Sequence, residues 1–206
     1  MQKENYKKLM EKELERVKQL EKKPTLLLHV CCAPCASAVL ELLHPFFEIT
    51  LFFYNPNIAP ESEFFYRKEE ICRLVQEMGF DDVSVMVPEY NGEVFETLAR
   101  GLEDLPEGGS RCERCYRLRL GKTAAYGKEK GFDYITTTLS ISPYKNALWL
   151  NEIGRELEAE YGIRYLVSDF KKGEGYKRSC ELSRQYDLYR QNYCGCIYSK
   201  GQAESL

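Results

Sequence analysis

A short apolar run, TLLLHVC at residues 25–31, constrains the fold more than any other part of the chain. The run has the length of a strand and does not alternate with polar residues, which is typical of a parallel strand buried on both faces. Further strand-like runs occur at residues 48–56, 83–88, 132–139 and 163–170. Strands that alternate with helices form right-handed crossover units. The sequence therefore predicts an α/β fold with a five-stranded, mostly parallel sheet covered by helices on both faces.

Helical patterns fill the intervals between these runs. They predict helices at residues 36–43, 60–79, 142–162 and 179–191, and across 93–131 apart from a loop at 105–110. An amphipathic pattern also covers residues 1–23 and ends before Pro24. Because a chain of 206 residues suits one buried core better than two, we expect a single domain at 25–206 with an N-terminal helical extension at 1–24.

The charge of the chain limits its partners and its location. Its 29 basic and 32 acidic residues give a net charge of -3, which excludes a uniformly basic nucleic-acid coat but allows local basic patches. The first 23 residues are charged throughout and lack the apolar core of a signal peptide. No run approaches the roughly 20 apolar residues that a membrane span needs. We therefore expect a cytoplasmic protein without a membrane partner.

Nine cysteines are the most unusual feature of the composition, and seven of them fall into three tight groups. The groups are Cys31, Cys32 and Cys35; Cys112 and Cys115; and Cys194 and Cys196. Clustered cysteines in a reducing compartment indicate metal binding or catalysis rather than structural disulfides. The isolated Cys72 and Cys180 are expected to be inert thiols, Cys180 at the start of the last helix.

The first two groups suit a thiolate-ligated metal site. The first lies where a strand meets a helix, whose N-terminus stabilises thiolates. The second is a Cys-x-x-Cys pair flanked by Arg111, Arg114, Arg117 and Arg119, whose charges lower thiolate pKa values. Four thiolates fit a structural zinc ion or a [4Fe–4S] cluster, and spacing alone does not separate the two. An expected position at the ligand-binding edge of a full-sized sheet favours iron–sulfur.

The third group, Cys194-Gly-Cys196, leaves three interpretations open. A disulfide between such close residues is strained and easily reduced, which favours a redox-active pair. Two further metal ligands or two free thiols are the alternatives.

Four segments are expected to meet at one edge of the sheet, because ligands of open α/β sheets bind beyond the carboxyl ends of the strands. They are HVCCAPC, YNPN, TTTLS and DFKKGEGYKR, each at the end of an expected strand. His29 precedes the cysteines within a buried strand and is expected to be a hydrogen-bonded core histidine.

Six motifs, taken in order, are similar to those of a known family. LLLHVCCAPC, YNPNIAPESEF, EGGSRCERCYRLRL, TTTLSISPYKN, DFKKGEGYKRS and YRQNYCGCIYS resemble the cobalamin-independent epoxyqueuosine reductases across residues 25–200. The resemblance implies the last step of queuosine synthesis, in which epoxyqueuosine at the wobble position of tRNA is reduced to queuosine. It also implies a fold like that of the nucleotide α-hydrolases (HUP-like). ATP use is not expected, because HVCCAPC replaces the glycine-rich phosphate loop of that fold.

The resemblance also implies cofactors and partners. Its [4Fe–4S] ligands would be Cys31, Cys32, Cys112 and Cys115, and its redox-active disulfide would join Cys194 to Cys196. An adjacent mononuclear iron is a further hypothesis, with Cys35 and Asp169 as its ligands. The partners would be tRNA carrying epoxyqueuosine and an unidentified electron donor.

Basic and aromatic residues near the expected edge suit an anticodon loop, because cations contact phosphates and tyrosine stacks on unpaired bases. The residues expected to bind tRNA or the modified base are Tyr54, Asn55, Lys171, Lys172, Tyr176, Lys177, Arg178 and Arg190. Two other functions fit parts of the pattern: a thiol-disulfide oxidoreductase that uses Cys194 and Cys196, and a non-enzymatic zinc-binding RNA module.

Overall fold

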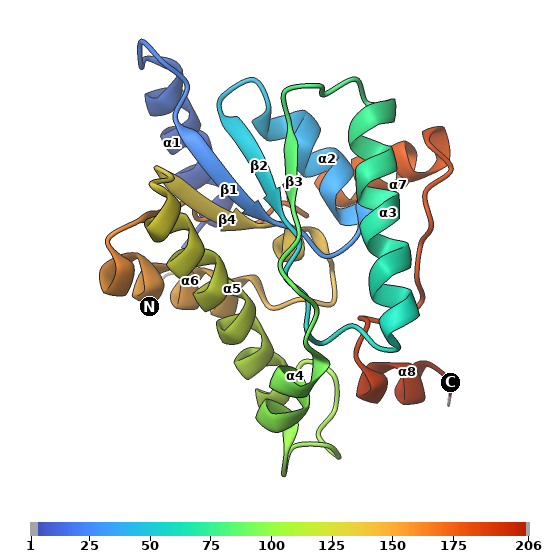
Figure 1. Cartoon of the computed structure of the whole chain (residues 1–206). Helices are drawn as coiled ribbons and strands as arrows, with labels where there is room; N and C mark the ends of the chain where they lie inside the picture. The colour runs from blue at the N-terminus through green and yellow to red at the C-terminus, as the bar shows by residue number, and fades with distance from the viewer. Residues whose placement is uncertain (1–3, 205–206) are drawn as a thin grey trace.

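A five-stranded sheet forms the centre of the computed structural model, which describes residues 4–204 (Figure 1). The strands are β1 (Thr25–His29), β2 (Glu48–Phe52), β3 (Ser84–Met86), β4 (Tyr134–Thr137) and β5 (Arg164–Tyr165). Their order is β3-β2-β1-β4-β5, and every pair of neighbours is parallel. This is the doubly wound order, in which the ligand crevice lies where the strand order reverses, between β1 and β4. The predicted α/β fold and strand number are confirmed.

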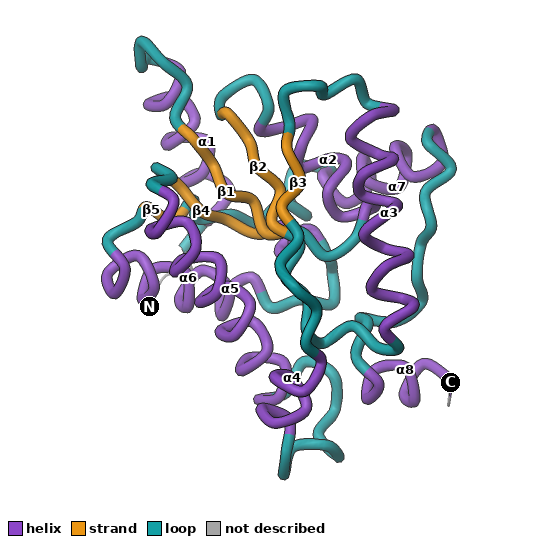
Figure 2. Tube along the Cα trace, in the orientation of Figure 1, coloured by secondary structure: helices purple, strands orange, loops and turns teal. Residues whose placement is uncertain are grey.

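Helices cover both faces of the sheet (Figure 2). They are α1 (Tyr6–Lys18), α2 (Ala33–Leu43), α3 (Glu61–Glu77), α4 (Gly92–Ala99), α5 (Ser110–Lys130), α6 (Ala147–Tyr161), α7 (Gly175–Gln185) and α8 (Ile197–Glu204), with a 3-10 turn at Thr138–Ile141. Buried residues of α1, α2, α3 and α7 form one core, and those of α5 and α6 form the other.

Burial on both faces of the sheet explains the run of leucines in β1. Leu26 and Leu28 pack into the core on one face, whereas Leu27 packs into the core on the other, and all three are fully buried. Since successive side chains of a strand point to opposite faces, a central strand needs apolar residues at every position.

Helix α1 packs directly on the larger core. Its side chains Met10, Leu14 and Val17 are buried together with residues of α2 and β1. The Asn5 side chain caps the helix by accepting a hydrogen bond from the amide of Lys8 at 3.2 Å.

Two expected boundaries at the carboxyl edge of the sheet are wrong. The fifth strand ends at Tyr165 rather than residue 170, because side chains replace the strand partners of the segment that follows: the amide of Ser168 donates to the Asn151 side chain, and the amide of Phe170 donates to the Ser140 hydroxyl. Helix α6 begins at Ala147 rather than at residue 142, because the side chain of Asn146 caps the helix directly before Ala147.

The C-terminal region is also more helical than expected. Helix α7 begins at Gly175, so Tyr176, Lys177 and Arg178 belong to its first turn rather than to a loop, and Cys180 lies in its second turn. Helix α8 follows the Cys-Gly-Cys segment, where the sequence predicted only a tail.

Candidate metal and redox site

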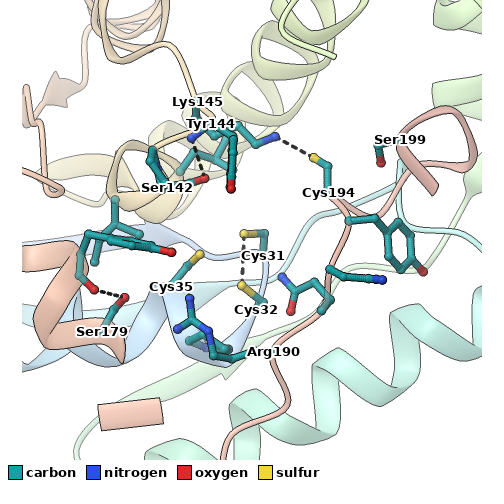
Figure 3. A pocket seen from close by; sticks show the side chains of 18 of the residues that line it. Cys31, Cys32, Cys35, Ser142, Tyr144, Lys145, Ser179, Arg190, Cys194 and Ser199 are labelled. Carbon is teal, nitrogen blue, oxygen red and sulfur yellow. Dashed lines mark hydrogen bonds between the residues drawn. The ribbon is translucent and has the colours of Figure 1, made fainter. Parts of the chain in front are cut away.

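A cavity of about 490 Å³ lies at the carboxyl ends of the central strands (Figure 3). Its walls come from the first cysteine group after β1, from most of residues 139–145 after β4, and from residues 190–194 of the tail. Tyr176 and Ser179 of α7 also line it, as do Glu107, Arg119 of α5 and Ser199 of α8. The cavity therefore lies where the strand order reverses, at the edge that the sequence indicated.

The first cysteine group forms a compact cluster of sulfur atoms. The Sγ atoms of Cys31, Cys32 and Cys35 all lie within 4.8 Å of one another, and the first two are 3.8 Å apart. Cys32 is the N-cap of α2, and Pro34 lies in the first turn of that helix. The positive end of the helix dipole therefore faces the thiols, and the three sulfur atoms could hold a metal ion.

The three thiols compete for protons. Hydrogen bonds from Cys31 and Cys35 lower the pKa of Cys32. The same hydrogen-bond network raises the pKa of Cys35, and burial raises it further. Cys32 is therefore the first of the group to ionise, and a bound cation would be needed to deprotonate all three.

The second cysteine group begins α5. Cys112 and Cys115 lie in the first two turns of this helix, and both are buried. The amide of Gly108 donates to the Sγ of Cys112 at 3.3 Å. Burial raises the pKa of Cys115 to about 12, so this thiol stays neutral unless a cation binds it. Both cysteine groups thus lie at helix N-termini that favour negative charge.

The loop before α5 is held by one arginine. A single nitrogen of Arg111 donates to the carbonyl oxygens of Leu102, Glu103 and Leu105, at 2.6–2.8 Å. Arg111 therefore shapes the loop rather than facing the thiols. Arg114 and Arg117 are exposed, and Arg117 pairs with Glu156.

Arg119 alone of the four flanking arginines reaches the thiols. It is 1% exposed and lines the cavity. Burial by itself would lower its pKa, but the nearby Cys115 and Cys31 raise the pKa above its usual value. It is therefore a permanent cation between the first two cysteine groups.

His29 is a core histidine, as the sequence predicted. Burial, assisted by the charge of Arg119, lowers its pKa to about 3. Its Nδ1 lies 2.8 Å from the hydroxyl of Thr137, and its Nε2 lies 3.2 Å from the carbonyl oxygen of Tyr54 and 3.3 Å from the Nε of Arg119. The low pKa keeps the ring neutral, so it has little capacity to shuttle protons at neutral pH.

The third cysteine group is asymmetric. Cys194 lines the cavity, and its Sγ accepts a hydrogen bond from the ammonium of Lys145 at 3.0 Å (Figure 3). Cys196 is buried in a cluster that also contains Cys115, and its thiol donates to the Ser199 hydroxyl at 3.4 Å. All nine cysteines are free thiols.

Gly195 is required between the two thiols. Its φ is 122°, a conformation that side chains rarely adopt. A Cβ atom there would lie 3.0 Å from Ile58 and 3.1 Å from Arg67. The Gly195 carbonyl accepts a hydrogen bond from the amide of Ala59 at 2.8 Å, which fixes the turn against the loop before α3.

The residues around the thiols suit an anionic thiolate-ligated group. Arg67 is 1% exposed, and its Nη2 has no hydrogen-bond partner among the described residues. Burial would lower the pKa of Arg67, but Cys32 and Glu63 raise it. Buried cations without full pairing would offset the charge of ionised thiols. The donor set is soft sulfur, which zinc and iron–sulfur clusters prefer.

The structure brings some predicted site residues to the cavity and keeps others away. Tyr176 and Arg190 line it together with Cys31, Cys32, Cys35 and Cys194. Cys112 shares a buried cluster with Cys31 and Cys32, but neither Cys112 nor Cys115 belongs to the close group of three sulfur atoms.

The remaining predicted residues do not line the cavity, and most have partners elsewhere. Asn55 is buried and bonds Val30 and Arg119; Lys177 pairs with Glu174; Arg178 pairs with Glu41 and Glu181; Asp169 pairs with Lys171. Lys171 also lies within 3.5 Å of the carbonyls of Ser140 and Lys145. Tyr54 is half-buried, and Lys172 is exposed.

Three charged residues of the site were not singled out from the sequence. They are Arg67 of α3, Lys145 before α6 and Glu107 before α5. Lys145 falls within TTTLSISPYKN and Glu107 begins EGGSRCERCYRLRL, two of the six motifs, and that was their only sequence signal. Arg67 lies outside the six motifs and had no sequence signal.

Among the described residues, no helix is long and apolar enough to cross a membrane.

Solved structures support the fold. A predicted subunit of tRNA methyltransferase from Methanocaldococcus jannaschii superimposes with a TM-score of 0.50 over 77% of this chain and 74% of its own length. The two sequences are only 14% identical, so the likeness concerns the fold alone.

Sequence comparison identifies the family. The family model described as epoxyqueuosine reductase QueH matches residues 26–202. The epoxyqueuosine reductase QueH of Streptococcus pyogenes serotype M1 is 41% identical over 96% of this chain and 79% of its own length. That of Thermotoga maritima is 38% identical over 85% of this chain and 90% of its own length. The chain therefore belongs to the epoxyqueuosine reductase QueH family.

Proposed function

We propose that this chain reduces epoxyqueuosine to queuosine in tRNA. The reaction converts an epoxide to an alkene, releases the oxygen as water and consumes two electrons and two protons. The observation that supports this best is a single cavity, in a chain of this family, lined by Cys31, Cys32, Cys35 and Cys194. Thiols, and metals bound by thiolates, are the redox centres that side chains can supply.

The proposed ligands of a [4Fe–4S] cluster are Cys31, Cys32, Cys112 and Cys115. Both pairs are buried and begin a helix, and the buried cation Arg119 lies near them. A cluster bound there would supply electrons one at a time at low potential. Arg119 and Arg67 would compensate its negative charge.

Cys35 is the thiol of the first group that this ligand set does not use. We extend the proposal to a mononuclear iron beside the cluster, with Cys35 as a ligand because its sulfur lies in the same group of three. Asp169 would serve as a second ligand only after leaving Lys171, since the two side chains pair at 2.9 Å.

Cys194 and Cys196 form the proposed redox pair. Oxidation of two thiols to a disulfide releases two electrons and two protons, which is the requirement of the reaction. The pair lies between the cavity, which Cys194 lines, and a buried cluster that contains Cys115. An external electron donor would then reduce the disulfide for the next turnover.

The charge of the cavity wall favours an RNA ligand. Its basic residues are Arg119, Lys145 and Arg190, whereas Glu107 is its one acidic residue among those described, although the whole chain carries a net charge of -3. Arg190 and Tyr176 lie at the wall where a phosphate and an unstacked base would enter.

Anaerobic purification followed by an assay tests the proposal. We expect a brown protein with about four irons per cluster and broad absorption typical of thiolate-bound iron. It should convert epoxyqueuosine in tRNA to queuosine, which nucleoside mass spectrometry detects. The variants Cys31→Ser and Cys112→Ser should lose both colour and conversion. Cys72→Ser is the control, because Cys72 lies within α3 and outside the three groups.

Two outcomes would identify other functions. A colourless protein with one zinc ion and no conversion would indicate a zinc-binding RNA module. Reduction of protein disulfides that survives Cys31→Ser and Cys112→Ser would indicate a thiol-disulfide oxidoreductase.

A further inference from the structure

Lys145 is a buried lysine on the wall of the cavity. Its side chain is only 7% exposed, and it lies in the turn between the 3-10 helix and α6. Lysine is rarely buried unless its charge is paired or used, because desolvation of an ammonium is costly.

Two acceptors from distant segments hold the ammonium in place. Its Nζ donates to Sγ of Cys194 at 3.0 Å (Figure 3). It also donates to Oε1 of Glu107 at 2.6 Å. An ammonium has three N–H donors, so these two contacts leave one for a molecule in the cavity. Lys145 thus contacts a carboxylate and a thiol of the redox pair, and it lines the cavity where the substrate would bind.

The chemistry of the reaction needs an acid at this place. An epoxide oxygen that leaves carbon must take up two protons to become water. Burial by itself would lower the pKa of Lys145, but the nearby Cys194, Tyr116 and Glu107 raise it, so the resting side chain is a cation. Transfer to the departing oxygen remains favourable, because alkoxide and hydroxide are very strong bases.

We propose that Lys145 is the acid that protonates the departing oxygen, and that Cys194 then returns the proton to Lys145. This inference rests on the proposed reductase function. The ammonium gives one proton to the oxygen as a C–O bond breaks, and the neutral amine then takes the proton of the Cys194 thiol along the existing hydrogen bond.

The step balances over one turnover. The two C–O bonds of the epoxide break and a C=C bond forms, while the S–H bonds of Cys194 and Cys196 are replaced by one S–S bond. The two electrons come from the two thiols. The second proton comes from Cys196, whose thiol donates to the hydroxyl of Ser199, another residue of the cavity wall. The oxygen leaves as water.

Three variants test whether Lys145 acts as an acid or only holds the segment of Cys194 in place through their hydrogen bond. Lys145→Met removes the charge, Lys145→Arg keeps the charge but holds its protons too tightly to give them up, and Lys145→Ala leaves room for an added amine. Lys130→Met is the control, because Lys130 is exposed on α5 and pairs with Glu129.

The assay measures steady-state conversion of epoxyqueuosine tRNA by the holoenzyme, with a dithiol present to reduce the Cys194–Cys196 pair after each turnover. We expect Lys145→Met and Lys145→Arg to lower kcat about 100-fold or more, the size of a lost general acid, with KM and bound iron unchanged. Ethylammonium and its more acidic analogues should restore the Lys145→Ala enzyme, at rates that depend on the pKa of the amine. The Lys130→Met enzyme should match the wild type.

Three results would overturn the inference: a wild-type kcat in Lys145→Arg or Lys145→Met, loss of iron along with activity, or no restoration of Lys145→Ala by any amine. Failure of the wild-type holoenzyme itself to convert the tRNA would instead overturn the proposed function, and this inference with it.

Discussion

The guanidinium of Arg119 donates a hydrogen bond to the side-chain oxygen of Asn55 over 2.6 Å, and its Nε lies 3.3 Å from the ring of His29. All three side chains are at most 1% exposed. Asn55 in turn donates to the carbonyl of Val30 at 2.9 Å. One buried cation therefore ties the ends of β1 and β2 together immediately before Cys31.

Replacement of Arg119 by methionine should disrupt this arrangement. We expect Arg119→Met to lower the free energy of unfolding by about 1–3 kcal/mol, because Asn55 loses a buried hydrogen-bond partner. It should also lower the metal content of anaerobically purified protein, since the thiols lose their nearby cation. Urea unfolding and metal analysis measure the two effects. Arg117→Met, an exposed change on the same helix, is the matched control; equal stability of the two variants would contradict the assignment.

Helical phase explains why Arg119 could be predicted only in part. Four arginines flank Cys112 and Cys115 in the sequence, and the flanking charge alone does not separate them. Arg119 follows Cys115 by four residues, so the two lie on one face of α5, whereas Arg117 faces solvent. Arg111 also lies four residues from Cys115, so the spacing reduces the four arginines to two, and only the loop contacts of Arg111 separate it from Arg119.

Other parts of the site depend on tertiary contacts that no local pattern encodes. The sheet was predictable because a strand buried on both faces, such as β1, must be apolar throughout. Lys145 was not, because it lies in an irregular turn and its partners Glu107 and Cys194 are 38 and 49 residues away in the chain. The short β5 was also not predictable, since the side chain of Asn151 takes the place of a strand partner.

Gly195 should tolerate no side chain. Gly195→Ala places a Cβ against Ile58 and Arg67 in a left-handed conformation, which costs about 1–2 kcal/mol before any steric contact. We expect the Cys194–Cys196 pair to change its reduction potential and the enzyme to lose turnover. Thiol titration in dithiol buffers measures the potential.

Gly79→Ala is the control for this change. Gly79 also has a positive φ, 70°, but nothing lies within 4 Å of its added Cβ. It should lose stability without any change in the redox behaviour of the pair. A Gly195→Ala protein with wild-type potential and turnover would show that the turn geometry does not matter.

Glu70 and Arg73 of α3 hold the tail that leads to Cys194. Arg73 donates to the carbonyls of Tyr186 and Asp187 at 3.0 and 3.1 Å, and Glu70 accepts from the amide of Tyr189 at 3.0 Å. The hydrogen bonds from Arg73 lower the pKa of Glu70 below its usual value of 4.5, against the opposing effect of burial.

The Glu70–Arg73 pair should make the stability of the segment at residues 186–195 depend on pH in the acid range. Because the folded-state pKa of Glu70 is lowered, its stabilising effect is complete above pH 4.5 and is lost as the pH falls through the folded pKa. Hydrogen exchange of residues 186–195, measured against pH, should show this loss. Glu70→Gln should expose the same amides already at pH 7, and Glu77→Gln, which removes only an exposed partner of Arg73, should not. Equal protection in both variants would refute the role of Glu70.

Arg190 and Arg178 differ in their availability to RNA. Arg190 lines the cavity, with its guanidinium carbon 5.9 Å from the ring centroid of Tyr176. Arg178 lies on the same helix as Tyr176 but pairs with Glu41 and Glu181. A phosphate at the cavity would therefore meet Arg190 first, and contact with Arg178 would require these ion pairs to break.

We expect Arg190→Ala to weaken tRNA binding and to reduce the slope of log affinity against log salt concentration by about 1, the effect of one lost phosphate contact. Arg178→Ala should change affinity less, because its charge is already compensated. Arg184→Ala, an exposed change in the last turn of α7, is the matched control. Filter binding at several salt concentrations, with unmodified tRNA as the probe, measures each slope. If Arg178→Ala reduced the slope and Arg190→Ala did not, the RNA would have to cross the outer face of α7 rather than the cavity.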